Sequence, residues 1–447
     1  MTHGRILAVH DISCVGRCSL TVALPIVSSV GIECSVLPTA VLSTHTGGFT
    51  GFTYRDLTED IVPIQNHWKT LDLTFDGFYT GFLGSFEQID LVRDLIDKTS
   101  NEKTTVYVDP VMGDNGKLYT IFDEAFAKKM ATLCEKADVL MPNLTELCYM
   151  LDLEYKDGPY TWDYIEEVLK KAEQFGLQKI VITGISFEKG KVGSVYKDYE
   201  TGECGQVMRD YIDGYYHGTG DVFGSALVGA LESGISLKDS VRIAVDFTVS
   251  AIKKTHESGA DVRYGVDFEQ CLGYYQKRVS ILKDGLKFEP VKDDKQLTRV
   301  AGLAAKIWPE AFDSMDLPDM IDYMIKTMQS EKAISDYIKD GYLYYLIESN
   351  SEDIGYIGMR PEGDKMFLSK AYLLSSYRGM GLFDDIVDFV KKISLENGLR
   401  CIYLSTNRKN ERAIQAYLHT GFEIVKSIDK PIGEGFVMSD YILELKF

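Results

Sequence analysis

Residues 5–38, RILAVHDISCVGRCSLTVALPIVSSVGIECSVLP, contain the pattern that decides the fold. The first five of them, Arg5–Val9, form a short apolar run that predicts a buried strand. Residues 19–30 have helical spacing and stop before Gly31, which is typical of a helix C-terminus. A second strand-like run, residues 32–38, follows directly. A strand, a helix and a strand in this order predict a βαβ unit with parallel strands.

The same alternation continues to about residue 275. Further strands are expected at residues 77–82, 104–109, 138–142 and 179–183, with helical segments between them. The fold class expected is therefore α/β, a mostly parallel sheet flanked by helices. In such sheets ligands bind beyond the carboxyl ends of the strands. Asp109, Asn143 and Thr183 all lie at such ends, which makes this edge of the sheet the first candidate site.

Length and charge exclude several classes of protein. The chain has 447 residues, which predicts two or three domains, and 45% of them are hydrophobic, which excludes a disordered chain. There are 67 acidic and 48 basic residues, so the net charge is −19. A surface this acidic repels nucleic acid and anionic membranes, so we expect neither as a partner. Phosphorylated cofactors remain compatible with it, because backbone N–H groups can hold them.

Location and cysteine chemistry are also suggested by the sequence. The N-terminus has no apolar run of signal-peptide length, and no run of 18 apolar residues appears, so we expect a cytoplasmic protein. The eight cysteines are scattered, which predicts reduced thiols rather than a zinc site. Cys14 and Cys18 are the closest pair, and we expect both to pack in apolar surroundings.

The second half of the chain has a different order of expected helices and strands. Residues 283–295 are charged and carry Gly and Pro, which predicts a linker. A helical region, residues 296–340, precedes three strands in close succession, at residues 342–349, 354–359 and 365–374. Helices at residues 382–397 and 411–420 and strands at residues 401–406, 422–426 and 436–446 complete the chain. Consecutive strands without helices between them predict an α+β domain.

A glycine turn in the first half, His217-Gly-Thr-Gly-Asp221, directly precedes an apolar helix. Backbone N–H groups at such a turn, together with the helix dipole, stabilise an anion. An aspartate at this position can accept the proton of an attacking hydroxyl while the turn holds a phosphoryl group. The alternative is a tight turn in which Asp221 only caps the helix.

Two other segments could serve the same chemistry. Asp109-Pro-Val-Met-Gly-Asp114 places two carboxylates after a strand, and Asn143-Leu-Thr-Glu146 places an amide and a carboxylate after another. Carboxylates beside phosphates usually hold Mg²⁺, directly or through water, so Asp109 and Glu146 are the metal candidates. The alternative for Asn143 and Glu146 is a helix start with favourable placement of charge.

In this order and spacing, residues 3 to about 280 resemble the ribokinase-like superfamily, and within it the vitamin B6 kinases. The motifs that carry the resemblance are Ile6–Ser13, Pro38–Thr46, Gly81–Ser85, Asp109–Asp114, Asn143–Glu146 and Gly218–Asp221. The resemblance implies transfer of the ATP γ-phosphate to the 5′-hydroxymethyl group of pyridoxal, pyridoxamine or pyridoxine, a step in salvage of pyridoxal 5′-phosphate. It also implies a homodimer formed through this domain.

The same resemblance implies a role for each site residue. Asp221 would be the base. Gly218, Thr219 and Gly220 would form the anion hole. The residues around Mg-ATP would be Asp109, Asp114, Asn143, Glu146 and Thr183. Asp11, Thr46 and Phe82 would lie against the pyridine ring.

Position 11 departs from the pattern of many pyridoxal kinases, which have Ser there. A carboxylate pairs with an amine or a protonated ring nitrogen better than a hydroxyl does. Asp11 therefore favours pyridoxamine or a related aminomethyl pyrimidine. Hydroxymethylpyrimidine kinase, a close relative, remains an alternative.

The second half contains another strand-to-helix turn with glycines. The strand at residues 365–374 leads into Ser375-Ser-Tyr-Arg-Gly-Met-Gly-Leu382, a turn that can hold a pyrophosphate. Asn410 is a good helix cap, and Tyr417 falls two turns later on the same face of that helix. The alternative for Tyr417 is simple packing of an amphipathic helix on the sheet.

Together these elements, over roughly residues 292–447, resemble the GNAT family of acetyl-CoA-dependent N-acetyltransferases. The resemblance implies that Arg378, Gly379, Met380, Gly381 and Leu382 bind the CoA pyrophosphate. Asn410 would lie near the pantetheine arm, and Tyr417 would protonate the departing thiolate. Phe383 departs from the pattern, because Gly or Ala usually ends this turn.

The sequence thus predicts two joined enzymes, a B6-vitamer kinase over residues 1–285 and an acetyltransferase over residues 292–447. The cofactors expected are ATP, Mg²⁺ and acetyl-CoA. The alternative combination is a hydroxymethylpyrimidine kinase joined to a sensor domain that binds acetyl-CoA without transferring acetyl groups.

Overall fold

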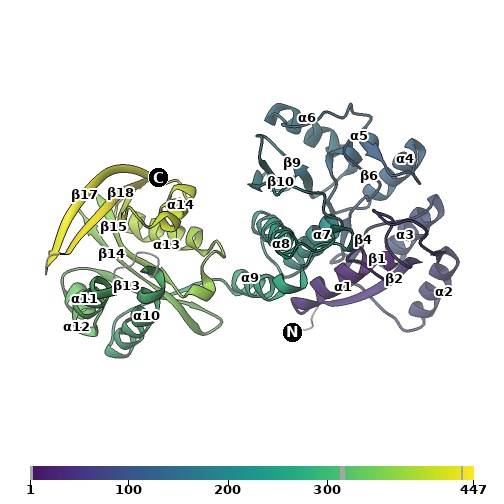
Figure 1. The fold of residues 1–447 in the computed structure, drawn as a ribbon. Coiled ribbons are helices and arrows are strands. Elements are labelled where there is room, and N and C mark those ends of the chain that lie inside the picture. The colour runs from purple at the N-terminus through teal and green to yellow at the C-terminus, as the bar shows by residue number, and fades with distance from the viewer. Residues whose placement is uncertain (1–3, 313–317, 434–435) are drawn as a thin grey trace. The chain divides into compact units, whose positions relative to one another are not determined.

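The computed structural model describes residues 4–312, 318–433 and 436–447. The chain divides into two compact units, which meet between Lys283 and Asp284. Figure 1 shows a sheet with helices in each unit, and each unit is described by itself.

The first unit is built on a nine-stranded sheet with the order β11-β10-β9-β8-β5-β4-β1-β2-β3. The six strands from β9 to β2 run parallel. The strand β3 at one edge, and the strands β10 and β11 at the other end of the sheet, run antiparallel to their neighbours. The strands are β1 (Arg5–Ser13), β2 (Glu33–Leu42), β3 (Tyr54–Asp56), β4 (Gly77–Thr80), β5 (Thr105–Val108), β8 (Val139–Leu140), β9 (Lys179–Ile185), β10 (Lys191–Asp198) and β11 (Cys204–Asp210), and a separate hairpin joins β6 (Gly113–Asp114) to β7 (Lys117–Leu118).

Helices cover both faces of this sheet because alternate strand residues feed two cores. Phe78, Val106 and Ile182 pack in one core, whereas their neighbours Tyr79 and Tyr107 pack in the other. The first core lies under α2 (Thr58–Lys69), α3 (Phe86–Thr99), α4 (Glu124–Cys134), α5 (Leu144–Leu151) and α6 (Trp162–Ala172), and the second under α1 (Leu20–Ser29), α7 (Thr219–Glu232), α8 (Leu237–Ser258) and α9 (Leu272–Asp284). The predicted fold class is confirmed.

The antiparallel strands β3, β10 and β11 are absent from the sequence prediction. β3 and β11 form the two edges of the sheet and leave one side open to solvent, so they carry polar and charged residues instead of an apolar run. In β10 only three consecutive residues, Ser194–Tyr196, and Asp198 are buried. That pattern is too weak to separate from a loop.

The second unit is built on a seven-stranded sheet with the order β12-β13-β14-β15-β16-β18-β17. Its strands are β12 (Lys287–Pro290), β13 (Leu343–Ser349), β14 (Glu352–Glu362), β15 (Lys365–Leu373), β16 (Cys401–Asn407), β17 (Glu423–Gly433) and β18 (Phe436–Lys446). Its helices are α10 (Asp294–Phe312), α11 (Pro318–Met328), α12 (Glu331–Lys339), α13 (Leu382–Glu396) and α14 (Glu411–His419). An α+β architecture of this kind was expected from the consecutive strands.

One pair of strands in the second sheet separates along its length. β15 and β16 are the only parallel neighbours among the described strands of this sheet, and they pair only at Met366–Ile402 and Phe367–Tyr403. Beyond those pairs each strand continues without the other as a partner. The turn after β15 therefore follows the point where the sheet opens.

The linker predicted at residues 283–295 is wrong. β12 lies inside it and pairs antiparallel with β13, with Phe288 opposite Ile347. Phe288 stacks on Phe389 with ring centroids 4.0 Å apart. A four-residue edge strand with charges on its outer face has no readable apolar period, which explains the error.

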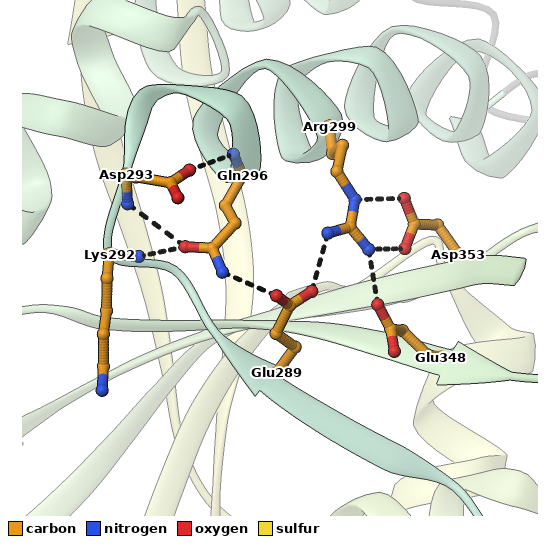
Figure 2. Close-up of polar contacts among 7 residues, drawn as sticks. All are labelled: Glu289, Lys292, Asp293, Gln296, Arg299, Glu348 and Asp353. Atoms are coloured by element: carbon orange, nitrogen blue, oxygen red, sulfur yellow. Dashed lines mark hydrogen bonds and ion pairs between the residues drawn. The ribbon is translucent and has the colours of Figure 1, made fainter. Parts of the chain in front are cut away.

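The charges that suggested a linker belong to an ordered cluster, which Figure 2 shows around Arg299. The Arg299 guanidinium, on α10, bonds three carboxylates from three strands, Glu289 on β12, Glu348 on β13 and Asp353 on β14, at 2.5–2.8 Å. The three carboxylates raise the pKa of Arg299. Gln296 donates to Glu289 at 2.7 Å and so ties the start of α10 to the same strand. The side chains of this cluster are between about one-quarter and one-third exposed, so the main effect of their ion pairs is to fix β12 in register.

Among the described residues, every helix is too short or too polar to span a lipid bilayer.

We predict that residues 284–447 unfold cooperatively as a separate fragment and that a fragment starting at residue 292 is less stable. The shorter fragment loses β12 and exposes the edge of β13. Its unfolding midpoint, measured by scanning calorimetry, should be roughly 5 °C lower or more. Glu289→Gln in the longer fragment is the control that weakens the Arg299 cluster without removing the strand. Equal midpoints for the two fragments would show that β12 adds no stability.

Candidate active sites

The N-terminus of α7 is shaped to receive an anion. Gly218 is the N-cap residue with a φ of 74°, and any Cβ there would collide with the Arg17 carbonyl. Gly220 differs, because a Cβ on it would meet no described atom within 4 Å. The first turn of this 14-residue helix therefore faces open space, and its free N–H groups and dipole favour negative charge there.

Asp221 lies in that first turn, but its carboxylate does not cap its own helix. It accepts a hydrogen bond from the backbone N–H of Ser19, in the loop after β1. The pKa of Asp221 is raised to about 7, because burial and, to a smaller extent, the charge of Asp11 outweigh the lowering effect of the Ser19 hydrogen bond. A carboxylate that titrates near neutral pH can exchange a proton with a substrate hydroxyl. The simple capping role considered for Asp221 does not fit this geometry.

Ser19 connects the two acidic groups, and sequence reasoning missed it. Its hydroxyl donates to Asp11 at 2.5 Å, while its N–H serves Asp221. Its φ of 55° and ψ of −129° fall outside the regions that L-residues normally occupy, which is backbone strain of the kind found at functional sites. The spacing of apolar residues in the sequence cannot identify such a residue.

The Asp11 carboxylate is buried and partly satisfied. Besides Ser19, the Ser13 hydroxyl donates to it at 3.2 Å. Burial raises its pKa, the two serines lower it, and the charge of His45 lowers it a little more. Cys18 is buried beside Asp11 and Asp221, but Cys14 is exposed, so the packing expected for Cys14 is wrong.

The sequence analysis did not select two neighbouring histidines, His45 and His217, of which His45 acts on Asp11 through its charge. His45 accepts from the Gly47 N–H at Nδ1, at 3.1 Å, and its Nε2 lies 2.5 Å from the Arg263 carbonyl. The His217 ring is 5.2 Å from that of His45 and directly precedes the glycine turn. The sequence around both is rich in Gly and Thr, which resembles an ordinary loop.

The other two predicted substrate residues are less closely tied to the site. Thr46 follows His45 and is exposed. Phe82 is partly buried, and its ring packs against Phe122 with centroids 5.7 Å apart. Within the described part of the chain, neither side chain contacts Asp11 or Asp221. Contact of Thr46 and Phe82 with the pyridine ring of a substrate therefore remains a prediction.

The predicted nucleotide residues meet at the carboxyl ends of β5, β8 and β9. Asn143 and Glu146 form a capping box at the start of α5, because each side chain accepts from the other's backbone N–H. Glu146 also accepts from Met112 at 3.1 Å, and Asn143 donates to the Gly113 carbonyl at 2.8 Å. Asn143 further forms a parallel bridge with Thr183, two residues before the end of β9. The structural role considered for Asn143 and Glu146 is therefore real, and it holds the 112–116 loop in place.

Negative charge accumulates at this edge of the sheet. Burial, Glu146 and Asp221 raise the pKa of Asp109 well above its usual range. Burial raises the pKa of Glu146 to about 7 and also raises that of Asp114. A bound cation would offset this repulsion, which fits Mg²⁺. Among the described residues no three His, Cys, Asp or Glu side chains converge as ligands, so the cation would keep phosphate and water ligands.

The turn in the second unit begins at Arg378 and starts α13. Gly379 and Gly381 have φ angles of 76° and 68°, and Gly381 is the N-cap residue. The Arg378 side chain donates to the Leu373 carbonyl at 2.8 Å, so it ties the turn to the end of β15. A second arginine supplies charge to the open side of the turn, because Arg412 Nη2 lies 3.7 Å from the position of a Cβ on Gly379. The sequence analysis did not select Arg412.

Tyr417 lies on α14, whose first turn is capped by Asn410 through a 3.2 Å bond from Ala413. Burial raises the pKa of Tyr417 to about 12, so the phenol keeps its proton at neutral pH. Its ring contacts Phe383 with centroids 5.2 Å apart and Phe422 at 5.9 Å. The unusual Phe383 therefore orients Tyr417.

The chain is similar to known proteins in both units. Residues 24–265 match the family model for phosphomethylpyrimidine kinase, and residues 304–422 match that for the acetyltransferase (GNAT) family. A crystal structure from Bacteroides thetaiotaomicron, assigned as a phosphomethylpyrimidine kinase and containing pyridoxal, is 40% identical, with a TM-score of 0.59. The match covers 61% of this chain and 96% of that one.

Two curated relatives extend the comparison. The pyridoxine kinase of Bacillus subtilis is 33% identical over 205 residues, which are 44% of this chain and 70% of the relative. For the second unit, an uncharacterised N-acetyltransferase of Mycobacterium tuberculosis is 29% identical over 127 residues, which are 28% of this chain and 81% of the relative.

We predict that the turn at residues 378–382 binds acetyl-CoA mainly through backbone N–H groups. Gly381→Val should raise the dissociation constant about tenfold or more, because a branched side chain at positive φ both strains and blocks the turn. Arg412→Ala should weaken binding about three- to tenfold through loss of one charge contact. Tyr417→Phe is the matched control and should change affinity little. Calorimetric titration of the full chain measures all three, and no heat of binding up to millimolar acetyl-CoA would contradict the assignment.

Proposed function

The chain belongs to the phosphomethylpyrimidine kinase family and carries a C-terminal GNAT domain, and we propose that its first unit phosphorylates the 5′-hydroxymethyl group of a B6 vitamer with ATP. The observation that carries this proposal is Asp221, a carboxylate with a pKa of about 7 beside the open N-terminus of α7. Among the relatives, a pyridoxine kinase and a structure that contains pyridoxal support the choice of substrate.

In this proposal Asp221 accepts the proton of the 5′-hydroxyl while that oxygen attacks the γ-phosphorus of ATP. The bond to the bridging oxygen breaks, and ADP leaves with the electron pair. The N–H groups of Gly218, Thr219 and Gly220 hold the oxygens of the transferred group. Mg²⁺, when bound, neutralises phosphate charge.

The remaining polar residues of the nucleotide side have positioning roles in the proposal. Asp109 and Asp114 face the metal and phosphates. Glu146 acts through water, because its oxygens already accept two backbone N–H groups. Asn143 and Thr183 hold the adjoining loop ends against the nucleotide.

We propose pyridoxamine as the preferred vitamer. Two carboxylates, Asp11 and Asp221, lie close enough for the charge of one to raise the pKa of the other. A cationic aminomethyl group would relieve that repulsion. Thr46 and Phe82 are proposed to contact the ring. Hydroxymethylpyrimidine, which also carries an amino group, is the second candidate, and the description of the matching family favours it.

For the second unit we propose acetyl-CoA-dependent N-acetylation. An acceptor amine attacks the thioester carbonyl, the C–S bond breaks, and the CoA thiolate takes the proton of Tyr417. Arg378 to Leu382 and Asn410 position the cofactor, with Arg412 near the pyrophosphate. The M. tuberculosis relative is named an N-acetyltransferase, which supports this reaction class. A sensor that binds acetyl-CoA without transfer would show binding and no turnover.

A cytoplasmic location, a role in pyridoxal 5′-phosphate salvage and a homodimer formed through the first unit complete the proposal. The net charge of −19 supports small-molecule substrates and argues against nucleic-acid or membrane-surface partners.

We predict that Asp221→Asn lowers kcat by about 10²–10⁴-fold and leaves ATP affinity nearly unchanged, because the amide keeps the shape but cannot accept the proton. In the unaltered enzyme kcat should fall as pH drops through about 7, because the raised pKa means that the base is protonated below that value. Steady-state assays from pH 5 to 9 measure both effects. Asp213→Asn, at an exposed carboxylate in the preceding loop, is the control. Full turnover by the Asp221 variant would show that it is not the base.

We also predict that Asp11→Asn lowers kcat/KM for pyridoxamine about tenfold relative to pyridoxal, through loss of one charge-assisted hydrogen bond. The same variant should move the acidic limb of kcat to lower pH for every substrate, because the charge of Asp11 raises the pKa of Asp221. Parallel assays on pyridoxal, pyridoxamine, pyridoxine and hydroxymethylpyrimidine decide the substrate. If the kcat/KM ratios between substrates stayed unchanged while the pH dependence of kcat shifted, Asp11 would lie beside the base Asp221 but away from the amino group of the substrate.

A further inference from the structure

Tyr79 is a buried polar residue that none of the proposed steps uses. It lies on β4, fully buried, with its side chain in the core between the sheet and α7. Its hydroxyl has no hydrogen-bond partner within the described part of the chain. Burying an unpaired hydroxyl is unfavourable, whereas phenylalanine would fill the same space without that penalty. The hydroxyl is therefore expected to find a partner in another state of the protein.

The groups around this hydroxyl identify the partner. Burial is the main reason that the pKa of Tyr79 is raised, and the charges of Asp109 and then Asp221 add to it. The neighbouring Ser225 side chain acts in the opposite direction and lowers the pKa of Tyr79, while its own hydroxyl donates to the Asp221 backbone carbonyl at 2.6 Å. Cys34 on β2 and His10 on β1 complete the surroundings. His10 is neutral, since burial lowers its pKa to about 3, and its ring packs edge-on against Tyr79 with centroids 4.4 Å apart.

A glycine in α7 leaves room for the hydroxyl. A Cβ on Gly224 would lie 2.5 Å from Tyr79 Oη and 3.7 Å from Asp109 Oδ2. The two oxygens thus approach one point beside α7, one turn after Asp221. The same point is 3.4 Å from the ring carbon Cζ, which is ordinary van der Waals contact. A side chain at position 224 would therefore collide with the Tyr79 hydroxyl but not with the rest of the Tyr79 ring.

On the basis of the kinase activity proposed above, we propose that Tyr79 is a positioning residue of the phosphoryl-transfer site. Its hydroxyl donates a hydrogen bond to the Asp109 carboxylate when Mg-ATP is bound and fixes the direction in which that carboxylate faces the metal. His10 holds the plane of the ring, and Gly224 keeps the path between the two oxygens open.

The test is a double-mutant cycle with Tyr79→Phe and Gly224→Ala in the full chain. Each single variant should lower kcat about five- to twentyfold and raise the Mg²⁺ concentration for half-maximal rate, with KM for the vitamer unchanged. The double variant should be no worse than either single one, because both remove the same hydrogen bond. Gly224→Ala should lower the thermal midpoint with tyrosine at position 79 but not with phenylalanine, which removes the colliding oxygen.

The chain offers a matched control pair on the same helix. The Tyr275 hydroxyl donates to the Ala226 carbonyl at 3.1 Å, and it would collide with a Cβ on Gly229. Tyr275→Phe and Gly229→Ala should change stability and leave the Mg²⁺ dependence unaltered.

Two results would overturn the proposal: unchanged kcat and Mg²⁺ dependence in Tyr79→Phe, or kinetic losses that add in the double variant. If the unaltered chain phosphorylates no vitamer, the proposed function fails instead. Calorimetric titration of ATP at several Mg²⁺ concentrations then still tests Tyr79, since its variant should bind Mg-ATP more weakly and metal-free ATP equally.

Discussion

The hydrogen bonds of Ser19 hold two mutually repelling carboxylates, Asp11 and Asp221, in one small volume. This arrangement joins the loop after β1 to the first turn of α7. The repulsion and burial there bring the pKa of Asp221 near neutrality, and the strained backbone of Ser19 is the cost of the arrangement. The sheet, the two helical layers and the glycine turn all serve to bring these segments together.

The two units use the same physical device for different ligands. In each, a strand leads to a turn with glycine at positive φ, and the turn starts a helix whose N-terminus faces open space or a cationic side chain. In the first unit the adjoining groups are carboxylates, which suit a metal-bound nucleotide. In the second unit Arg412 adds positive charge, and Tyr417 holds a proton.

The sequence was sufficient for the parallel strands, the second-unit helices and the glycine turns, because long apolar runs and Gly-x-Gly turns are local signals. It failed where the signal is not local. β12 is four residues long, and it is held against β13 by the bond from Arg299, on the next helix, to Glu289. Ser19, His45 and Tyr79 matter through partners far away in the chain, and Arg412 had no motif. For Asn143 and Glu146 the two readings were not exclusive, since the capping box also aligns the loop beside the metal candidates.

The place of β12 also determines how the two catalytic units are coupled. α9 ends at Asp284 and β12 begins at Lys287, so only Gly285 and Leu286 lie between them, and the two elements are at most about 11 Å apart along the chain. Such a tether differs from a flexible linker, whose length sets an adjustable effective concentration. Any reorientation of one unit against the other must come from the backbone torsions of very few residues. Gly285, with a φ of 71°, is the natural pivot.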